Sequence, residues 1–341
     1  MLDPSGTQIF TKDAFPLLVG DIGGTNARFA VQEHAGAELV RLPSQQTADH
    51  RGFDDAVEAS LAAYELRPRS ALLAAAGPLQ HGRVDFTNSS WVLDPKNTMR
   101  RAGIDRCVVL NDFEAQALAL PCLDLATDCQ PIGPLATAPD RTKVVLGPGT
   151  GLGVGLMIRS DEHWIPVPGE GGHISLAPES KEELALWSIL LKERPRVSAE
   201  TLLSGNGLVT LYRAVATMTG LPAELDNPAA VVAHAGSGDQ LSDQTLTFFA
   251  RFLGRVAGDF ALTAMARGGV YLSGGVSRRI GPYLSGGEFR TAFESKDPHE
   301  ALMGEIPTFL VTASEPALTG LAALASAPSR YRINLTGRIF A

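Results

Sequence analysis

Two glycine-rich turns, each set between two apolar segments, are the part of this sequence whose residue types most clearly suggest chemistry. The first turn separates PLLVG at 16–20 from ARFAVQ at 27–32, and the second separates TKVVLG at 142–147 from GVGLMI at 153–158. Glycine lacks a Cβ, so backbone N–H groups in such turns can approach an oxyanion closely. A plain hairpin turn also favours glycine, but the repeated plan favours phosphate binding. The predicted phosphate-binding residues are Gly20, Asp21, Ile22, Gly23, Gly24 and Thr25 in the first turn, and Gly149, Thr150 and Gly151 in the second.

Other phosphate-binding motifs fit these turns poorly. The run GPGTGLG at 147–153 has the glycine spacing of a dinucleotide-binding fingerprint, but that motif needs a helix directly after it. Here an apolar run without a helical period follows instead. The P-loop motif G-x-x-x-x-G-K-[ST] is absent from the sequence. A carboxylate at a strand end can hold Mg²⁺, usually through water, so Asp21 is the predicted metal ligand.

A carboxylate in a position suited to catalysis follows the apolar segment CVVL. Asn111 and Asp112 end this predicted strand and precede the helical pattern EAQALAL. The carboxyl ends of strands are where α/β folds place their ligands. Asp112 could be a general base that takes the proton from an attacking hydroxyl. The alternative is that Asp112 caps the following helix, and both roles can hold for the pair.

A third group of polar residues lies in the glycine-flanked loop PGEGGH at 168–173. Glu170 and His173 are three residues apart, and a carboxylate with an imidazole can read the vicinal hydroxyls of a sugar. Metal ligation by His173 is the competing interpretation, but one His and one Glu without a cysteine cluster support it weakly. Glu200 and Asn88 have no distinguishing feature when taken alone.

A double glycine, Gly274-Gly275, ends the predicted strand GVYLS. These glycines would let a flat adenine ring lie on the backbone. A plain strand-to-helix turn explains them equally well.

Apolar strands and amphipathic helices alternate along the chain, which favours an α/β fold. The patterns predict helices over 53–66, 114–123, 181–193, 208–218, 244–266 and 319–326. A length of 341 residues suggests about two domains. One glycine-rich hairpin near the start of each predicted domain suggests two halves that face a common ligand, which is the plan of the actin-like ATPase fold.

Bulk composition excludes several classes of function. The net charge of −8 disfavours binding to nucleic acid or to an anionic membrane surface. The three cysteines form no C-x-x-C pair, which fits reduced thiols in a cytosol. The N-terminus has no signal-peptide pattern, and no apolar run reaches the ~20 residues of a membrane span. We therefore expect a cytoplasmic protein.

Together, in this order, the motifs closely resemble the bacterial glucokinases of the hexokinase and actin-like ATPase superfamily. The resemblance covers about 16 to 325. LVGDIGGTNARFA and GPGTGLGVG resemble the two phosphate motifs, and LNDFEAQALALP resembles the catalytic-base segment. PGEGGH and VSAETLLSG resemble the sugar-binding segments, and YLSGG resembles the adenosine segment.

The resemblance implies ATP-dependent phosphorylation of glucose to glucose 6-phosphate, with ATP and Mg²⁺ as the cofactors. It implies that Asp112 is the base and that Asn111, Glu170, His173 and Glu200 bind glucose, and Asn88 is a further predicted sugar ligand. It implies an actin-like ATPase (ribonuclease H-like) fold, with two domains around a hinged cleft. The small domain is expected at 1–122 plus 314–341 and the large domain at 123–313.

The family is commonly dimeric, so a homodimer is expected. The related repressor and kinase group has a structural zinc site with a cysteine cluster, which this sequence lacks, so His173 is not expected to bind zinc. The tail SRYRINLTGRIFA at 329–341 has no counterpart that the resemblance places.

Three other functions compete with this one. A kinase for another hexose would have the same motifs, and an acyl-phosphate kinase or chaperone-like ATPase would share the fold but would not need PGEGGH. A non-catalytic sugar sensor would have no need of Asp112.

Overall fold

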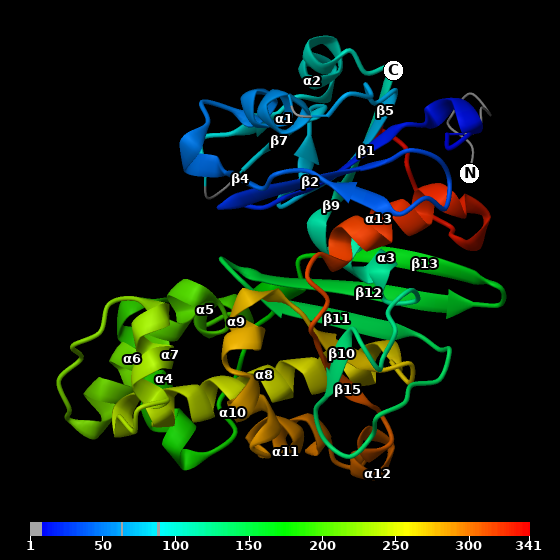
Figure 1. Ribbon diagram of the computed structural model, residues 1–341. Coiled ribbons are helices and arrows are strands. Elements are labelled where there is room, and N and C mark those ends of the chain that lie inside the picture. The colour runs from blue at the N-terminus through cyan, green and yellow to red at the C-terminus, as the bar shows by residue number, and fades with distance from the viewer. Residues whose placement is uncertain (1–8, 63, 87–88) are drawn as a thin grey trace. The chain divides into compact units, whose positions relative to one another are not determined.

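The computed structural model describes residues 9–62, 64–86 and 89–341, which divide into two units (Figure 1). Unit 1 comprises the chain up to Leu123, then Gly155–Pro168 and Ala313–Ala341, and unit 2 comprises Asp124–Val154 and Gly169–Thr312. Each unit combines strands with helices, so the α/β prediction is confirmed. The domain boundaries expected from the sequence did not include the return of Gly155–Pro168 to unit 1.

Unit 1 is built on a sheet with the strand order β16-β9-β5-β1-β2-β3, and β4 pairs with β2. The predicted first hairpin is present, because β1 and β2 pair antiparallel from Leu17 opposite Gln32 to Ile22 opposite Ala27. The strands β1, β5 and β9 run parallel, and β5 is buried along its whole length. The strands of unit 1 are β1 Leu17–Ile22, β2 Asn26–Gln32, β3 Leu39–Arg41, β4 Gln45–Gln46, β5 Ser70–Ala75, β6 Leu79–Gln80, β7 Arg83–Asp85, β8 Val92–Leu93, β9 Arg106–Asn111 and β16 Ile339–Phe340.

Helices of unit 1 pack on this sheet and on each other. In Figure 1, α13 lies beside α3, and a Cβ added at Gly320 would collide with the backbone of α3 at Ala115. Such a close approach requires glycine at that position. The helices of unit 1 are α1 Phe53–Leu61, α2 Pro95–Ala102, α3 Asp112–Ala119 and α13 Pro316–Ser326, with short 3₁₀ turns at Lys12–Ala14, Thr47–Asp49 and Pro328–Arg330.

Unit 2 has a sheet in which β11, β14 and β15 are parallel and β10 pairs antiparallel with β15. The order of the sheet is β10-β15-β14-β11-β12-β13, and the second glycine-rich turn joins β11 to β12. The chain enters unit 1 at Gly155, within β12, and continues there through β13 until Pro168. The strands of this sheet are β10 Cys129–Pro131, β11 Lys143–Pro148, β12 Leu152–Ser160, β13 His163–Gly169, β14 Val270–Leu272 and β15 Thr308–Val311.

A long helix, α8, organises the rest of unit 2. It buries Phe248, Phe249 and Phe252 and packs closely against α11, since a Cβ at Gly254 would collide with the backbone carbonyl of Phe289. The helices are α4 Lys181–Glu193, α5 Ala199–Leu202, α6 Gly205–Thr219, α7 Pro228–Ala235, α8 Gln240–Ala264, α9 Gly274–Arg279, α10 Gly281–Ser285, α11 Glu288–Glu294 and α12 Glu300–Gly304, with a 3₁₀ turn at Gly171–His173.

Several helix boundaries differ from those predicted. The helix predicted over 53–66 ends at Leu61, and Leu66 is exposed, so the apolar period does not continue into the core. The helix predicted over 114–123 covers Asp112–Ala119, because the cap is two residues earlier than the apolar pattern suggested. Among the residues that the structure describes, no helix has both the length and the hydropathy of a membrane span.

Candidate functional site

The first glycine-rich turn and Asn111-Asp112 follow strands that end at the same edge of the unit 1 sheet. Ile22 is level with Ala75 across β1 and β5, and Ala75 is level with Asn111 across β5 and β9. Neighbouring strands are about 4.8 Å apart, so the ends of β1 and β9 are about 10 Å apart. This spacing suits a nucleotide phosphate on one side and a substrate hydroxyl on the other.

The first turn presents unused backbone donors. The N–H of Gly23 donates to the carbonyl of Asn26 at 2.9 Å, which closes the turn. Within the described part of the chain, the N–H groups of Gly24 and Thr25 have no acceptor. Gly20 lies inside β1, where an added Cβ would press on Leu73, and Ile22 is buried. The donors available to an anion therefore come from the end of the turn and not from β1 itself.

Asp21 is a carboxylate that lacks a strong partner. Its Oδ2 is 3.8 Å from Nη1 of Arg28, and its side chain is 17% exposed. Burial raises the pKa of Asp21 to about 6, Arg28 opposes the shift, and the negative charge of Glu315 adds to it. A divalent cation nearby would supply the missing positive charge, and oxygen is the donor that Mg²⁺ prefers. The residues present thus fit the predicted metal site.

Asn111, and not Asp112, is the residue that caps α3. Asn111 Oδ1 accepts hydrogen bonds from the N–H groups of Phe113 at 2.9 Å and Glu114 at 3.2 Å. In turn, Glu114 Oε2 accepts from the N–H of Asn111. This reciprocal capping box makes Asp112 the first residue of the helix. Asp112 Oδ1 accepts from the N–H of Phe113 at 2.9 Å, so both side chains are held at the helix N-terminus, where negative charge is favoured.

The second glycine-rich turn in unit 2 has a similar pattern of donors. The N–H of Gly149 donates to the carbonyl of Gly151 at 2.8 Å. Within the described ranges, the N–H groups of Thr150 and Gly151 have no acceptor. The carbonyl of Gly149 accepts from the N–H of Gly205 at 2.8 Å, which ties this turn to the start of α6.

The predicted sugar-binding residues of unit 2 lie together beside this turn. Glu200 Oε2 accepts from the N–H of Leu152 at 2.8 Å. Glu200 Oε1 is 3.9 Å from Nδ1 of His173, and Nε2 of His173 is 4.0 Å from Oε2 of Glu170. All three side chains are partly exposed. Two carboxylates and an imidazole thus form one polar group of acceptors and donors suited to a polyhydroxylated ligand.

Tight packing of glycines places these residues. A Cβ at Gly172 would collide with the carbonyl of Leu152, so the 3₁₀ turn that carries His173 lies directly on β12. Arg196 Nη2 donates to the carbonyl of His173 at 2.5 Å. No sequence motif indicated this arginine, because its contact with the loop depends on tertiary structure.

Gly274 begins α9 and has a φ of +86°, with the position of its Cβ 2.7 Å from the carbonyl of Pro148. This close contact requires glycine. Gly275 has open space where its Cβ would be. The segment is therefore a strand-to-helix turn packed on the strand that leads into the second glycine-rich turn. Asn88, the remaining predicted sugar ligand, lies outside the described residues.

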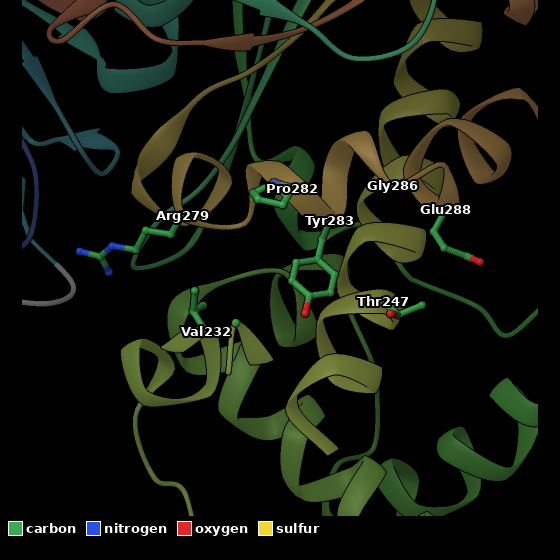
Figure 2. Close-up of a pocket in the computed structure, with 8 residues that line it drawn as sticks. Val232, Thr247, Arg279, Pro282, Tyr283, Gly286 and Glu288 are labelled. Atoms are coloured by element: carbon green, nitrogen blue, oxygen red, sulfur yellow. The ribbon is translucent and has the colours of Figure 1, made fainter. Parts of the chain in front are cut away.

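Unit 2 also contains a pocket of about 450 Å³ that no sequence motif indicated (Figure 2). In Figure 2, Tyr283 and Thr247 face the space next to Val232, and the guanidinium of Arg279 points away from them. Tyr283 donates to Asp243 at 2.6 Å, and burial together with this carboxylate raises the pKa of the phenol to about 12. The lining residues are Val232, Gly236, Thr247, Arg279, Pro282, Tyr283, Gly286 and Glu288.

The fold is the two-domain α/β fold of the actin-like ATPases, in the form found in sugar kinases. A glucokinase from an Antarctic psychrotroph is 34% identical and superposes with a TM-score of 0.78, covering 91% of this chain and 98% of the other. A ROK-family glucokinase from Streptomyces griseus, solved with glucose and AMPPNP, shares the fold at 20% identity and a TM-score of 0.60, covering 90% of this chain and 98% of the other.

The chain belongs to the glucokinase family, whose family model matches residues 18–328. A curated glucokinase from Rhizobium etli is 46% identical over 326 residues, covering 95% of each chain. A glucokinase from Agrobacterium fabrum is 45% identical and covers 95% of this chain and 96% of its own length. The resemblance inferred from the motifs is thereby confirmed.

Proposed function

We propose that this chain transfers the γ-phosphoryl group of ATP to the 6-hydroxyl of glucose and releases ADP and glucose 6-phosphate. The observation that carries the proposal is the family match over 18–328, which includes every predicted site residue. The product would enter glycolysis. A cytoplasmic homodimer, the form expected from the sequence, remains part of the proposal.

The proposed glucose ligands are those that the sequence analysis named. Asn111 and Asp112 come from the sheet edge of unit 1, and Glu170, His173 and Glu200 come from the polar group of unit 2. Asn88 is retained as a proposed ligand on sequence grounds. Carboxylates that accept hydroxyl protons and an imidazole that donates or accepts can match several sugar hydroxyls at once.

Asp112 would act as the general base. Its position at the N-terminus of α3 keeps the carboxylate at a sheet edge, where it can accept the proton of the 6-hydroxyl as the oxygen attacks phosphorus. A positioned base contributes about 10²–10⁴-fold to the rate. Alignment of the hydroxyl with the γ-phosphate supplies a large part of the remaining acceleration.

Each glycine-rich turn is proposed as a phosphate-binding element. The first offers the N–H groups of Gly24 and Thr25, and the second offers those of Thr150 and Gly151. Asp21 would hold Mg²⁺ through water, and when bound the ion neutralises charge on the β- and γ-phosphates. The turn at Gly274 would carry the adenosine, with the ring directed to the pocket beside Val232 and Tyr283. Apolar and aromatic walls suit a flat heteroaromatic ring.

A coupled assay of ADP release across several hexoses and phosphoryl donors tests the proposal. We expect turnover that requires both glucose and ATP. If another hexose is phosphorylated in preference to glucose, that hexose is the substrate. Glucose binding without turnover would favour a sugar sensor. ATP hydrolysis that is independent of sugar would favour a chaperone-like ATPase.

The base assignment has its own test. Asp112→Ala should lower kcat at least about 100-fold with little change in glucose affinity, because a base acts in the transition state. Asp105→Ala, at an exposed acid just before β9, is the matched control and should leave kcat unchanged. Retained turnover in Asp112→Ala would refute the assignment.

A further inference from the structure

The C-terminal segment 331–341 is the part of unit 1 that neither the sequence motifs nor the family match explains. The family match ends at residue 328, yet the chain continues through a buried Tyr331 and a buried Leu335 to the strand β16. The segment lies outside the family match and still enters the core, so it has a structural task that the motifs do not reveal.

This segment completes the sheet next to the proposed base. β16 pairs antiparallel with β9, with Ile339 opposite Val108 and Phe340 opposite Cys107. The N–H of Val109 donates to the carbonyl of Arg338 at 3.0 Å. Since β16 is the first strand in the order β16-β9-β5, β9 would be an edge strand without it. The strand that ends at Asn111 is therefore held on both sides.

Arg338 also reaches the capping box that holds Asn111 and Asp112. Its Nη1 lies 2.7 Å from Oε2 and 3.0 Å from Oε1 of Glu114. Glu114 Oε2 in turn accepts from the N–H of Asn111 at 3.4 Å. A continuous chain of bonds thus runs from the C-terminal segment to the residue that immediately precedes the base.

Glu114 depends on this arginine for its charge. Its side chain is 1% exposed, whereas that of Arg338 is 26% exposed. Burial raises the pKa of Glu114, and the charge of Arg338 is the main influence that lowers it. A buried carboxylate without its partner is strongly unfavourable, so removal of Arg338 would drive Glu114 to rearrange toward solvent or to take up a proton.

The start of the segment is anchored near the opposite end of α3. The hydroxyl of Tyr331 is 3.7 Å from Sγ of Cys122, which follows α3 in the chain. The segment therefore contacts residues near both ends of the short helix whose first residue is Asp112, which limits movement of that helix along its axis.

We propose that Arg338 is a positioning residue that acts through Glu114 to hold Asn111 and Asp112 in the geometry needed for phosphoryl transfer. The inference rests on the proposed function of Asp112. Misplacement of a catalytic group by about 1 Å can cost about 100-fold in rate, so loss of Arg338 should affect kcat far more than ATP binding.

The test compares Arg338→Met with the double variant Glu114→Gln/Arg338→Met. In Arg338→Met, we expect kcat to fall about 10- to 100-fold while KM for ATP stays within about twofold. A glutamine at position 114 can complete a capping box without a charge, so the double variant should recover kcat to within about threefold of the parent. Arg338→Lys keeps a positive charge but only a single ammonium group to donate hydrogen bonds, so its kcat should lie between those of the parent and Arg338→Met.

Controls separate positioning from stability. Arg332→Met alters an exposed arginine of the same segment and should leave kcat unchanged. All rates are referred to folded protein measured well below the melting temperature. A kcat of Arg338→Met within about twofold of the parent, or a double variant as impaired as the single variant, would overturn the proposal.

Amide hydrogen exchange gives a reading that does not depend on activity. The N–H groups of Phe113 and Glu114 are protected by the cap, and they should exchange at least about tenfold faster in Arg338→Met. Unchanged exchange would overturn the inference. If the parent chain phosphorylates no sugar, the proposed function fails, while the exchange measurement still decides whether Arg338 holds the cap. Should Arg338→Met not fold, Arg338→Lys and the double variant provide the same comparison.

Discussion

Gly151→Ala should weaken glucose binding while leaving the fold intact. An added Cβ at Gly151 would overlap Oε2 of Glu200, the atom that accepts from the N–H of Leu152. The obstacle is the end of a flexible side chain, so Glu200 can move away from the methyl group. Its displacement would separate it from Leu152 and from His173, 3.9 Å away. The substitution thus disturbs a proposed sugar ligand from within the proposed phosphate turn.

The expected change in KM for glucose follows from the hydrogen bonds that Glu200 would lose. A hydrogen bond to a charged group contributes about 1.5–3 kcal/mol, and about 1.4 kcal/mol corresponds to a factor of ten in affinity. Loss of the carboxylate contact with the sugar should therefore raise KM for glucose about 10- to 100-fold. The unpaired N–H of Leu152 should lower the free energy of unfolding by about 1–3 kcal/mol.

Steady-state kinetics with glucose and ATP varied separately provide the assay, and urea unfolding gives the stability. Gly149→Ala is the matched control, because a Cβ at Gly149 meets no atom within 4 Å. Any effect of that control should appear in KM for ATP and not in KM for glucose. A KM for glucose within twofold of the parent in Gly151→Ala, or an equal rise in Gly149→Ala, would refute the reasoning.

Two further predictions concern the ATP side. The pKa of Asp21 is raised to about 6 from an ordinary value near 4. The folded chain therefore binds a proton at Asp21 more tightly than the unfolded chain does. As a result, the contribution of Asp21 to the free energy of unfolding falls as the pH rises from about 4 to about 6. Asp21→Asn should therefore be more stable than the parent by up to about 3 kcal/mol at pH 7.5 without nucleotide, and equally stable near pH 4, by urea unfolding; equal stability at both pH values would contradict this. Val232→Trp should fill the pocket and raise KM for ATP at least about tenfold, with KM for glucose unchanged. Ala233→Trp, on the exposed side of α7, should change neither constant. An unaltered KM for ATP in Val232→Trp would show that the pocket does not bind adenine.

Local sequence was sufficient for much of the fold. The first hairpin was predicted from two apolar runs around a glycine-rich turn, and both of its strands are largely buried. α4 was predicted from its amphipathic pattern, and it buries one face. The helix at 53–66 was extended too far, since the helix ends at Leu61 and the side chain of Leu66 is exposed. The tail at 329–341 was left without a place, because a two-residue strand depends on the partner strand and not on its own sequence.

What the sequence determined by itself is the set of groups and the order in which the chain presents them. The spacing of glycines in the two turns and the position of Asp112 after an apolar strand follow from local rules of backbone conformation. Tertiary structure alone decided that Glu200 lies on Leu152 and His173, and that Arg338 supports Glu114 from 224 residues away. These contacts depend on packing between distant segments, and no local pattern of residues carries information about which distant partner will be brought near.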